Sequence, residues 1–99
     1  MFVVLLRFAD NQSQAGKHLA GHREWVQRGF DDGVFLLAGS LEPDAGGTVL
    51  AHNTSRTDLQ ARLDDDPFVS AGVVRPQILE VTPARADERL QFLLAGASS

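Results

Sequence analysis

The chain contains no cysteine among its 99 residues. This absence excludes disulfide scaffolds, thiol nucleophiles, iron–sulfur clusters and cysteine-based zinc sites. Basic residues are also few: nine Lys and Arg stand against thirteen Asp and Glu, for a net charge of -4. A dedicated nucleic-acid-binding protein needs a basic face, so we expect no nucleic-acid partner.

Long hydrophobic runs are missing as well. The apolar start, residues 1–8, is far shorter than the ~20 residues that span a bilayer, and it lacks the basic segment and cleavage site of a signal peptide. We therefore expect a cytoplasmic protein without membrane contact. The hydrophobic content of 43% is that of a folded protein, and the length allows one domain over residues 1–99. Its core is expected over about 1–82, with a C-terminal helical tail over about 84–96.

Short apolar segments alternate with two helical patterns. The predicted strands cover residues 1–8, 34–40, 48–52 and 73–81, and the predicted helices cover 15–32 and 56–63. Residues 42–47, which are rich in the turn formers Pro, Asp and Gly, are expected to join the second and third strands as a hairpin. The order β-α-β-β-α-β predicts an α+β, ferredoxin-like fold: a four-stranded antiparallel sheet with two helices on one face.

The first strand is apolar on both sides. Phe2, Val4 and Leu6 would point one way, and Val3 and Leu5 the other. Because two helices cover only one sheet face, something else must cover the opposite, open face. We expect a second copy of the chain to do so, giving a homodimer. The alternative is that the C-terminal segment folds back over this face.

His22 is the first candidate for chemistry. Ala15, Leu19, His22, Val26 and Phe30 recur at helical spacing and predict the core-facing stripe, with His22 near its edge. One interpretation is a partly buried His bonded to a backbone carbonyl, and the other is a general acid or base. His18 precedes it by one turn, but nothing supplies further metal ligands, so neither a metal nor a cofactor is expected.

Asp66 is the second candidate, within Asp64-Asp65-Asp66-Pro67. The structural interpretation is that Asp66 is the N-cap of a short helical turn with Pro67 at its first position, which would fully explain the residue. The functional interpretation is that Asp66 orients His22 and supports its charged form. Spacing alone leaves both interpretations open.

Two blocks of the chain resemble the YciI-like (YCII-related) family. The segment from His22 to Gly39, HREWVQRGFDDGVFLLAG, is similar to a family block in which a His is followed eleven positions later by a Gly and then by an apolar strand ending in Ala-Gly. The segment from Asp66 to Val73, DPFVSAGV, resembles the second block, Asp-Pro-aromatic followed by Ala-Gly-Val or Leu. Ser40 departs from the pattern, since many members have Pro there.

The resemblance implies a dimeric α/β barrel whose active site is a His–Asp pair, here His22 and Asp66. We accordingly expect a small cofactor-free enzyme that performs an elimination, an isomerisation or a related lyase step on a small cyclic or aromatic substrate. Trp25, Ser40 and Phe68 are expected to line its pocket. The alternative is a non-catalytic module for ligand binding or for interaction with a regulator.

Overall fold

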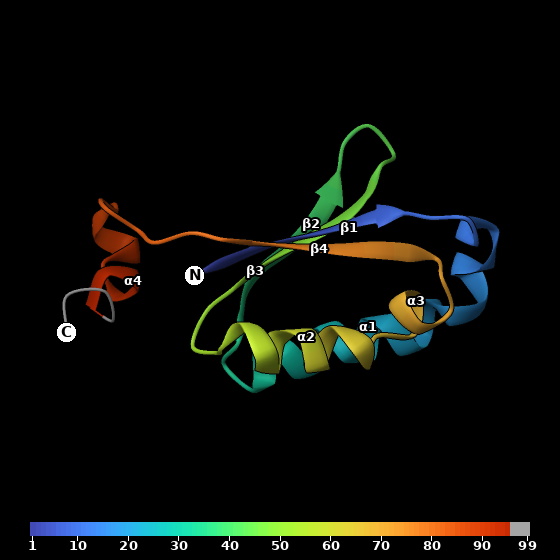
Figure 1. The fold of residues 1–99 in the computed structure, drawn as a ribbon, viewed down its shortest axis with the longest axis horizontal. Coiled ribbons are helices and arrows are strands. Elements are labelled where there is room, and N and C mark those ends of the chain that lie inside the picture. Colours follow the sequence, from blue (N-terminus) through green and yellow to red (C-terminus); the bar gives the residue numbers. More distant parts are fainter. Residues whose placement is uncertain (96–99) are drawn as a thin grey trace.

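A computed structural model describes residues 1–95. Its main elements are β1 (Phe2–Phe8), α1 (Ala15–Asp31), β2 (Phe35–Leu41), β3 (Gly46–Ala51), α2 (Arg56–Asp64), α3 (Pro67–Ser70) and β4 (Val74–Glu80). The strands form one antiparallel sheet in the order β2-β3-β1-β4. All three helices lie along one face of it, which confirms the ferredoxin-like α+β fold (Figure 1).

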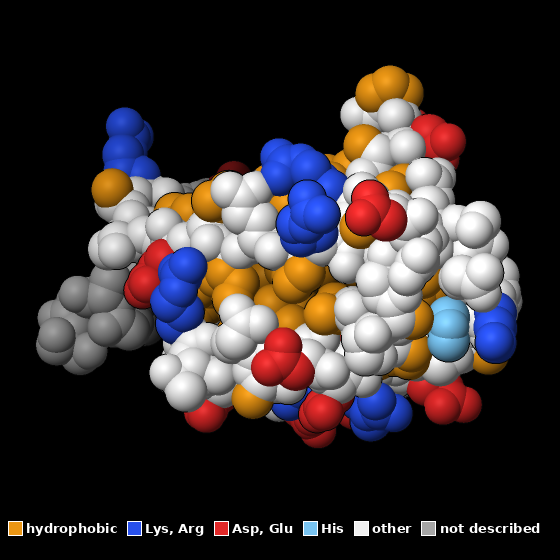
Figure 2. Space-filling model, turned by 45° about the vertical axis from the view of Figure 1, so that its right-hand side comes forward, with side chains coloured by type: hydrophobic (Ala, Val, Ile, Leu, Met, Phe, Trp, Pro, Cys, Tyr) orange, Lys and Arg blue, Asp and Glu red, His pale blue; other side chains and the backbone are white. Residues whose placement is uncertain are grey.

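The core fills the space between this sheet face and the helices. Phe2, Val4 and Leu6 of β1 point into it, and α2 contributes Leu59 and Leu63, both fully buried. In Figure 2 hydrophobic side chains show in the middle of the molecule, with Asp and Glu side chains gathered along the lower edge. Alternation along the central strand thus predicted correctly which residues share a face.

The hairpin and the strand edges also follow from local sequence. β4 is an edge strand, and Pro76 fits there because Pro has no N–H to donate to a further strand. The predicted β2–β3 hairpin is present, and Gly46 begins β3 directly after the turn, with a φ of +128°. A side chain at Gly46 would overlap the backbone carbonyl oxygen of Leu6, so only glycine fits here.

The buried side of α1 differs from the predicted stripe. Trp25 is 1% exposed and Gly29 is also buried, whereas Leu19 and Phe30 are 36% and 39% exposed. The helix is rotated so that the large indole, which gains most from burial, enters the core. Gly29 then lets the Phe35 ring pack directly against the helix backbone.

The open face of the sheet remains uncovered by residues 1–95. Leu37 and Leu79 are 48% and 41% exposed on it, and Val3 and Leu5 lie half-buried between them. The C-terminal tail does not fold back over this face. Its helix α4 (Phe92–Ala95) lies beyond the end of the sheet (Figure 1).

The tail contains a 3-10 helix, η2 (Glu88–Leu90), before α4. The backbone N–H of Arg89 and then its guanidinium donate hydrogen bonds to Asp87 and lower the pKa of that carboxyl. The Phe92 ring packs edge-on against His52. A helical tail was predicted to about residue 96, and residue 96 itself lies outside the described residues. No helix within residues 1–95 is long and apolar enough to cross a bilayer.

Gly29→Ala tests the close approach of α1 to β2. The added methyl would overlap the Phe35 ring, which is held by Trp25 and Phe30 on β2's helix-covered side. We expect the free energy of unfolding to fall by about 1–3 kcal/mol in urea titrations. The control is Gly16→Ala in the same helix, where nothing lies within 4 Å of the new methyl. Because Ala has the higher helix propensity, Gly16→Ala should keep or raise stability, and a loss at Gly16 as large as at Gly29 would contradict the packing explanation.

Candidate active site

Asp66 is positioned by the start of α3. Its backbone is extended, with φ -71° and ψ 121°, and its Oδ1 accepts a hydrogen bond from the backbone N–H of Phe68 at 3.0 Å. Pro67 occupies the first position of the helix, where a missing N–H costs nothing. Asp66 is therefore an N-cap, as one interpretation of the sequence held.

The same oxygen of Asp66 also meets His22 of α1. The distance from His22 Nδ1 to Asp66 Oδ1 is 2.9 Å. Asp66 is fully buried and the His22 side chain is 18% exposed. The partner of this half-buried His is thus a carboxyl group, not a backbone carbonyl, and one oxygen of Asp66 makes both the helix cap and the contact with His22.

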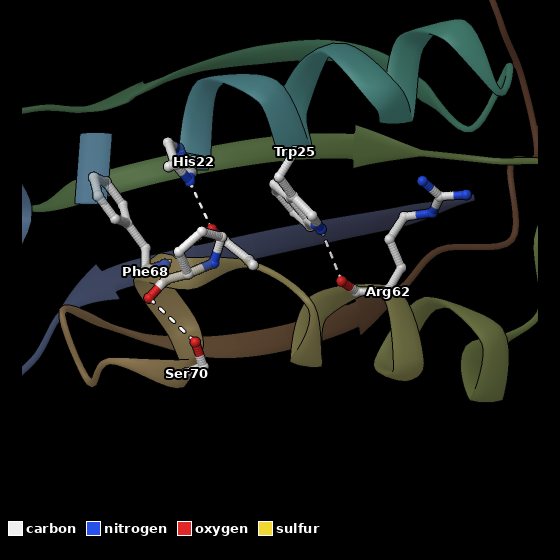
Figure 3. Close-up of polar contacts among 7 residues, drawn as sticks. His22, Trp25, Arg62, Phe68 and Ser70 are labelled. Carbon is white, nitrogen blue, oxygen red and sulfur yellow. Dashed lines mark hydrogen bonds and ion pairs between the residues drawn. The ribbon is translucent and has the colours of Figure 1, made fainter. Parts of the chain in front are cut away.

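Aromatic rings hold the His22 ring in place. The Phe68 ring stacks on it with centroids 4.0 Å apart and planes 5° apart, and the Trp25 ring lies 5.9 Å away at 24°. In Figure 3 the His22 ring lies between these two rings. Trp25 is itself anchored, because its indole N–H donates to the backbone oxygen of Arg62 at 2.8 Å.

The second ring nitrogen of His22, Nε2, is free to interact with a ligand. Nδ1 faces the Asp66 carboxyl, which favours the tautomer with its proton on Nδ1 and a lone pair on Nε2. No hydrogen-bond partner of Nε2 occurs within residues 1–95. Asp66 Oδ2 is buried and also lacks a partner there. A neutral imidazole held in this way can take up a proton and share the resulting charge with the carboxylate.

A hollow of about 200 Å³ adjoins His22. It lies between α1, α3 and the helix-covered face of the sheet, beside the hairpin. Its lining is largely apolar and includes Ser40 and Phe68 of the predicted set; the other lining residues are Leu6, Phe8, Leu19, Gly39, Gly46, Gly47 and Val74. Trp25 is not among them, since it lies in the core behind His22. Within residues 1–95 no three His, Asp or Glu side chains gather to hold a metal ion.

Several lining residues could not be predicted from the sequence. Phe8 shares the face of Leu6 by simple alternation, so its direction was predictable but its place at a hollow was not. Gly47 lines the hollow because it pairs with Leu6 on one side and with Ser40 on the other. That strand register is not readable from the sequence. Leu19 was expected inside the core and instead flanks the hollow.

Comparison with models of protein families identifies the family of this chain. The family described as YCII-related domain matches residues 1–83. The chain belongs to this YCII-related family. The resemblance found in the two sequence blocks is thereby confirmed, and the C-terminal tail lies past the matched region.

One solved structure shares the fold. It is the 5-chloro-2-hydroxyhydroquinone dehydrochlorinase of Burkholderia phenoliruptrix AC1100, in complex with 2,5-dihydroxybenzoquinone. The TM-score is 0.66, the sequence identity is 14%, and the similarity covers 82% of this chain and 93% of that one. At this identity the similarity establishes the fold only. No curated protein matches the chain.

Asp66→Ala tests the double role of the capping oxygen. The substitution leaves the Phe68 N–H and His22 Nδ1 without their acceptor, so the free energy of unfolding should fall by about 1–3 kcal/mol. Asp66→Asn keeps an oxygen for both contacts and should lose less. Asp65→Ala, at the neighbouring exposed aspartate, should change stability by no more than about 0.5 kcal/mol. Equal losses for Asp66→Ala and Asp65→Ala in urea titrations would contradict the assignment.

Proposed function

We propose that the chain is a small enzyme that moves a proton on a small cyclic or aromatic substrate without a cofactor. His22 is the general base or acid, and Asp66 is the residue that orients it. The observation that carries this proposal is the His22–Asp66 contact of 2.9 Å at the wall of a largely apolar hollow. Buried polar pairs beside such hollows are the usual form of an active site.

The size of the hollow favours a single ring. Its volume of about 200 Å³ exceeds the ~150 Å³ of an engineered protein cavity that takes up benzene. Phe68 and Phe8 offer flat apolar surface, and Ser40 and His22 offer polar contacts. The structural neighbour, whose ligand is also a one-ring compound, performs an elimination of the class proposed here.

The chemistry follows from the free Nε2. Its lone pair takes a proton from an activated C–H or O–H of the ring, and Asp66 stabilises the imidazolium that forms. Loss of a leaving group completes an elimination, whereas return of the proton to another carbon completes an isomerisation. One acid–base residue contributes about 10²–10⁴-fold, which suits an activated proton.

His22→Gln should lower turnover by about 10²–10⁴-fold on whichever halogenated or hydroxylated ring compound the wild-type chain converts. The matched control is His18→Gln, one turn earlier on α1 and outside the hollow, which should retain activity. Thermal melts check that both variants fold. Full activity of a folded His22→Gln variant would refute the role of His22.

A second candidate is a ligand-binding module without catalysis. Of the described residues that line the hollow, His22 is the one with an acid–base side chain, so any second proton transfer must rely on water or the substrate. A binding module predicts that His22→Gln weakens ligand binding while the wild-type protein converts none of the ring compounds. The same panel of compounds therefore separates the two candidates.

We also propose that two copies pair through the open sheet face. Leu37 and Leu79 are exposed there beside Val3, Leu5 and Leu50, and isolated monomers rarely expose such a contiguous apolar surface. A face-to-face pair would bury both sheets and enlarge the small core of the chain.

Leu79→Asp should convert the dimer to a monomer in light scattering coupled to size exclusion. The new charge would have to be buried without a partner, which costs several kcal/mol. Leu90→Asp adds the same charge to an equally exposed leucine of the tail and should leave the dimer intact. A wild-type protein that is monomeric at tens of micromolar would refute the proposal.

A further inference from the structure

We infer that the cleft beside His22 selects rings without an acidic substituent and accepts an uncharged or cationic group at its outer end. This inference rests on the proposed function and adds a substrate class to it. The feature behind it is a second hollow, of about 230 Å³, under the hairpin between β2 and β3.

The two hollows adjoin. Both are lined by Phe8, Ser40 and Gly46, so Ser40 lies on the wall that they share. The second hollow is lined in addition by Leu41, Glu42 and Asp44. A ligand that contacts His22 and extends past Ser40 therefore reaches two carboxylates at the hairpin tip.

No positive charge balances these carboxylates along the cleft. Among residues 1–95, no Lys or Arg lines either hollow. Arg7 and Arg75 are near in sequence to lining residues, but they lie opposite each other in the strand register on the open face of the sheet. The Arg7 guanidinium donates a hydrogen bond to Gln77 there. A carboxylate on the ligand would lose water, find no ion pair and meet like charge at the outer end.

Ser40 supplies the neutral polar contact. Leu6, Gly47 and Ser40 form one cross-strand row on the helix-covered face, and Gly47 leaves space between the other two side chains. No hydrogen bond occupies the Ser40 hydroxyl within residues 1–95. This hydroxyl can donate to or accept from a ring hydroxyl or carbonyl, while His22 meets the opposite side of the ring.

The test compares three ligands that differ in one substituent: hydroquinone, gentisate, which adds a carboxylate, and aminomethylhydroquinone, which adds an ammonium. Dissociation constants come from titrations that follow the His22 ring resonances of isotope-labelled protein in low salt. We expect gentisate to bind at least about tenfold more weakly than hydroquinone. Aminomethylhydroquinone should bind as well as hydroquinone or better.

The double variant Glu42→Gln/Asp44→Asn should reduce the penalty for gentisate to about threefold. Solvent partly screens the charges of these two exposed side chains, so they account for only part of the penalty. Glu88→Gln, which removes a charge from the tail, should leave the ratio unchanged. If gentisate binds as tightly as hydroquinone and shifts the His22 resonances, the charge selection is wrong while the proposed function stands. If no ring compound shifts the His22 resonances, the proposed function fails and this inference fails with it.

Discussion

A single carboxyl oxygen joins the two helices that border the candidate site. Asp66 Oδ1 accepts from the Phe68 backbone at 3.0 Å and meets His22 at 2.9 Å, so it caps α3 and ties that helix to α1. The cap also directs Phe68, whose ring stacks on His22. Substitutions of Asp66 therefore change stability and His22 geometry together, while substitutions of His22 leave the cap in place.

Most of the fold could be predicted because it depends on short-range signals. Turn residues, apolar alternation and helix caps set the order of the elements, and the Ser55 side chain caps α2 by accepting from the Asp58 N–H. Alternation in β1 identified both faces of the central strand. The predicted core-facing stripe of α1 was wrong for a physical reason. Spacing alone gives every apolar residue the same weight, whereas the large Trp25 side chain gains most from burial and determines which side of the helix faces the core.

The candidate site could be predicted only in part. His22 and Asp66 were identified by residue type and by resemblance, yet the distance between them depends on how α1 packs against α3 over 44 residues of chain. Ser40 and Phe68 do line the hollow, whereas Trp25 supports the His22 ring from the core. Gly47 lies opposite Leu6 on one side and Ser40 on the other because of the strand register, and no local sequence pattern encodes that register.

The glycine that follows the turn of the hairpin, Gly46, has a wider consequence. Gly46 presses β3 against the β1 backbone so closely that no side chain fits, which anchors the hairpin independently of the helices. The tip residues Glu42 and Asp44 belong to this anchored hairpin, while His22 and Asp66 belong to the helical layer. Under the proposed function, the groups that react and the groups that select the ligand are thus built on separate parts of the fold. Mutations at the hairpin tip would then change ligand recognition during evolution without disturbing the His22–Asp66 contact.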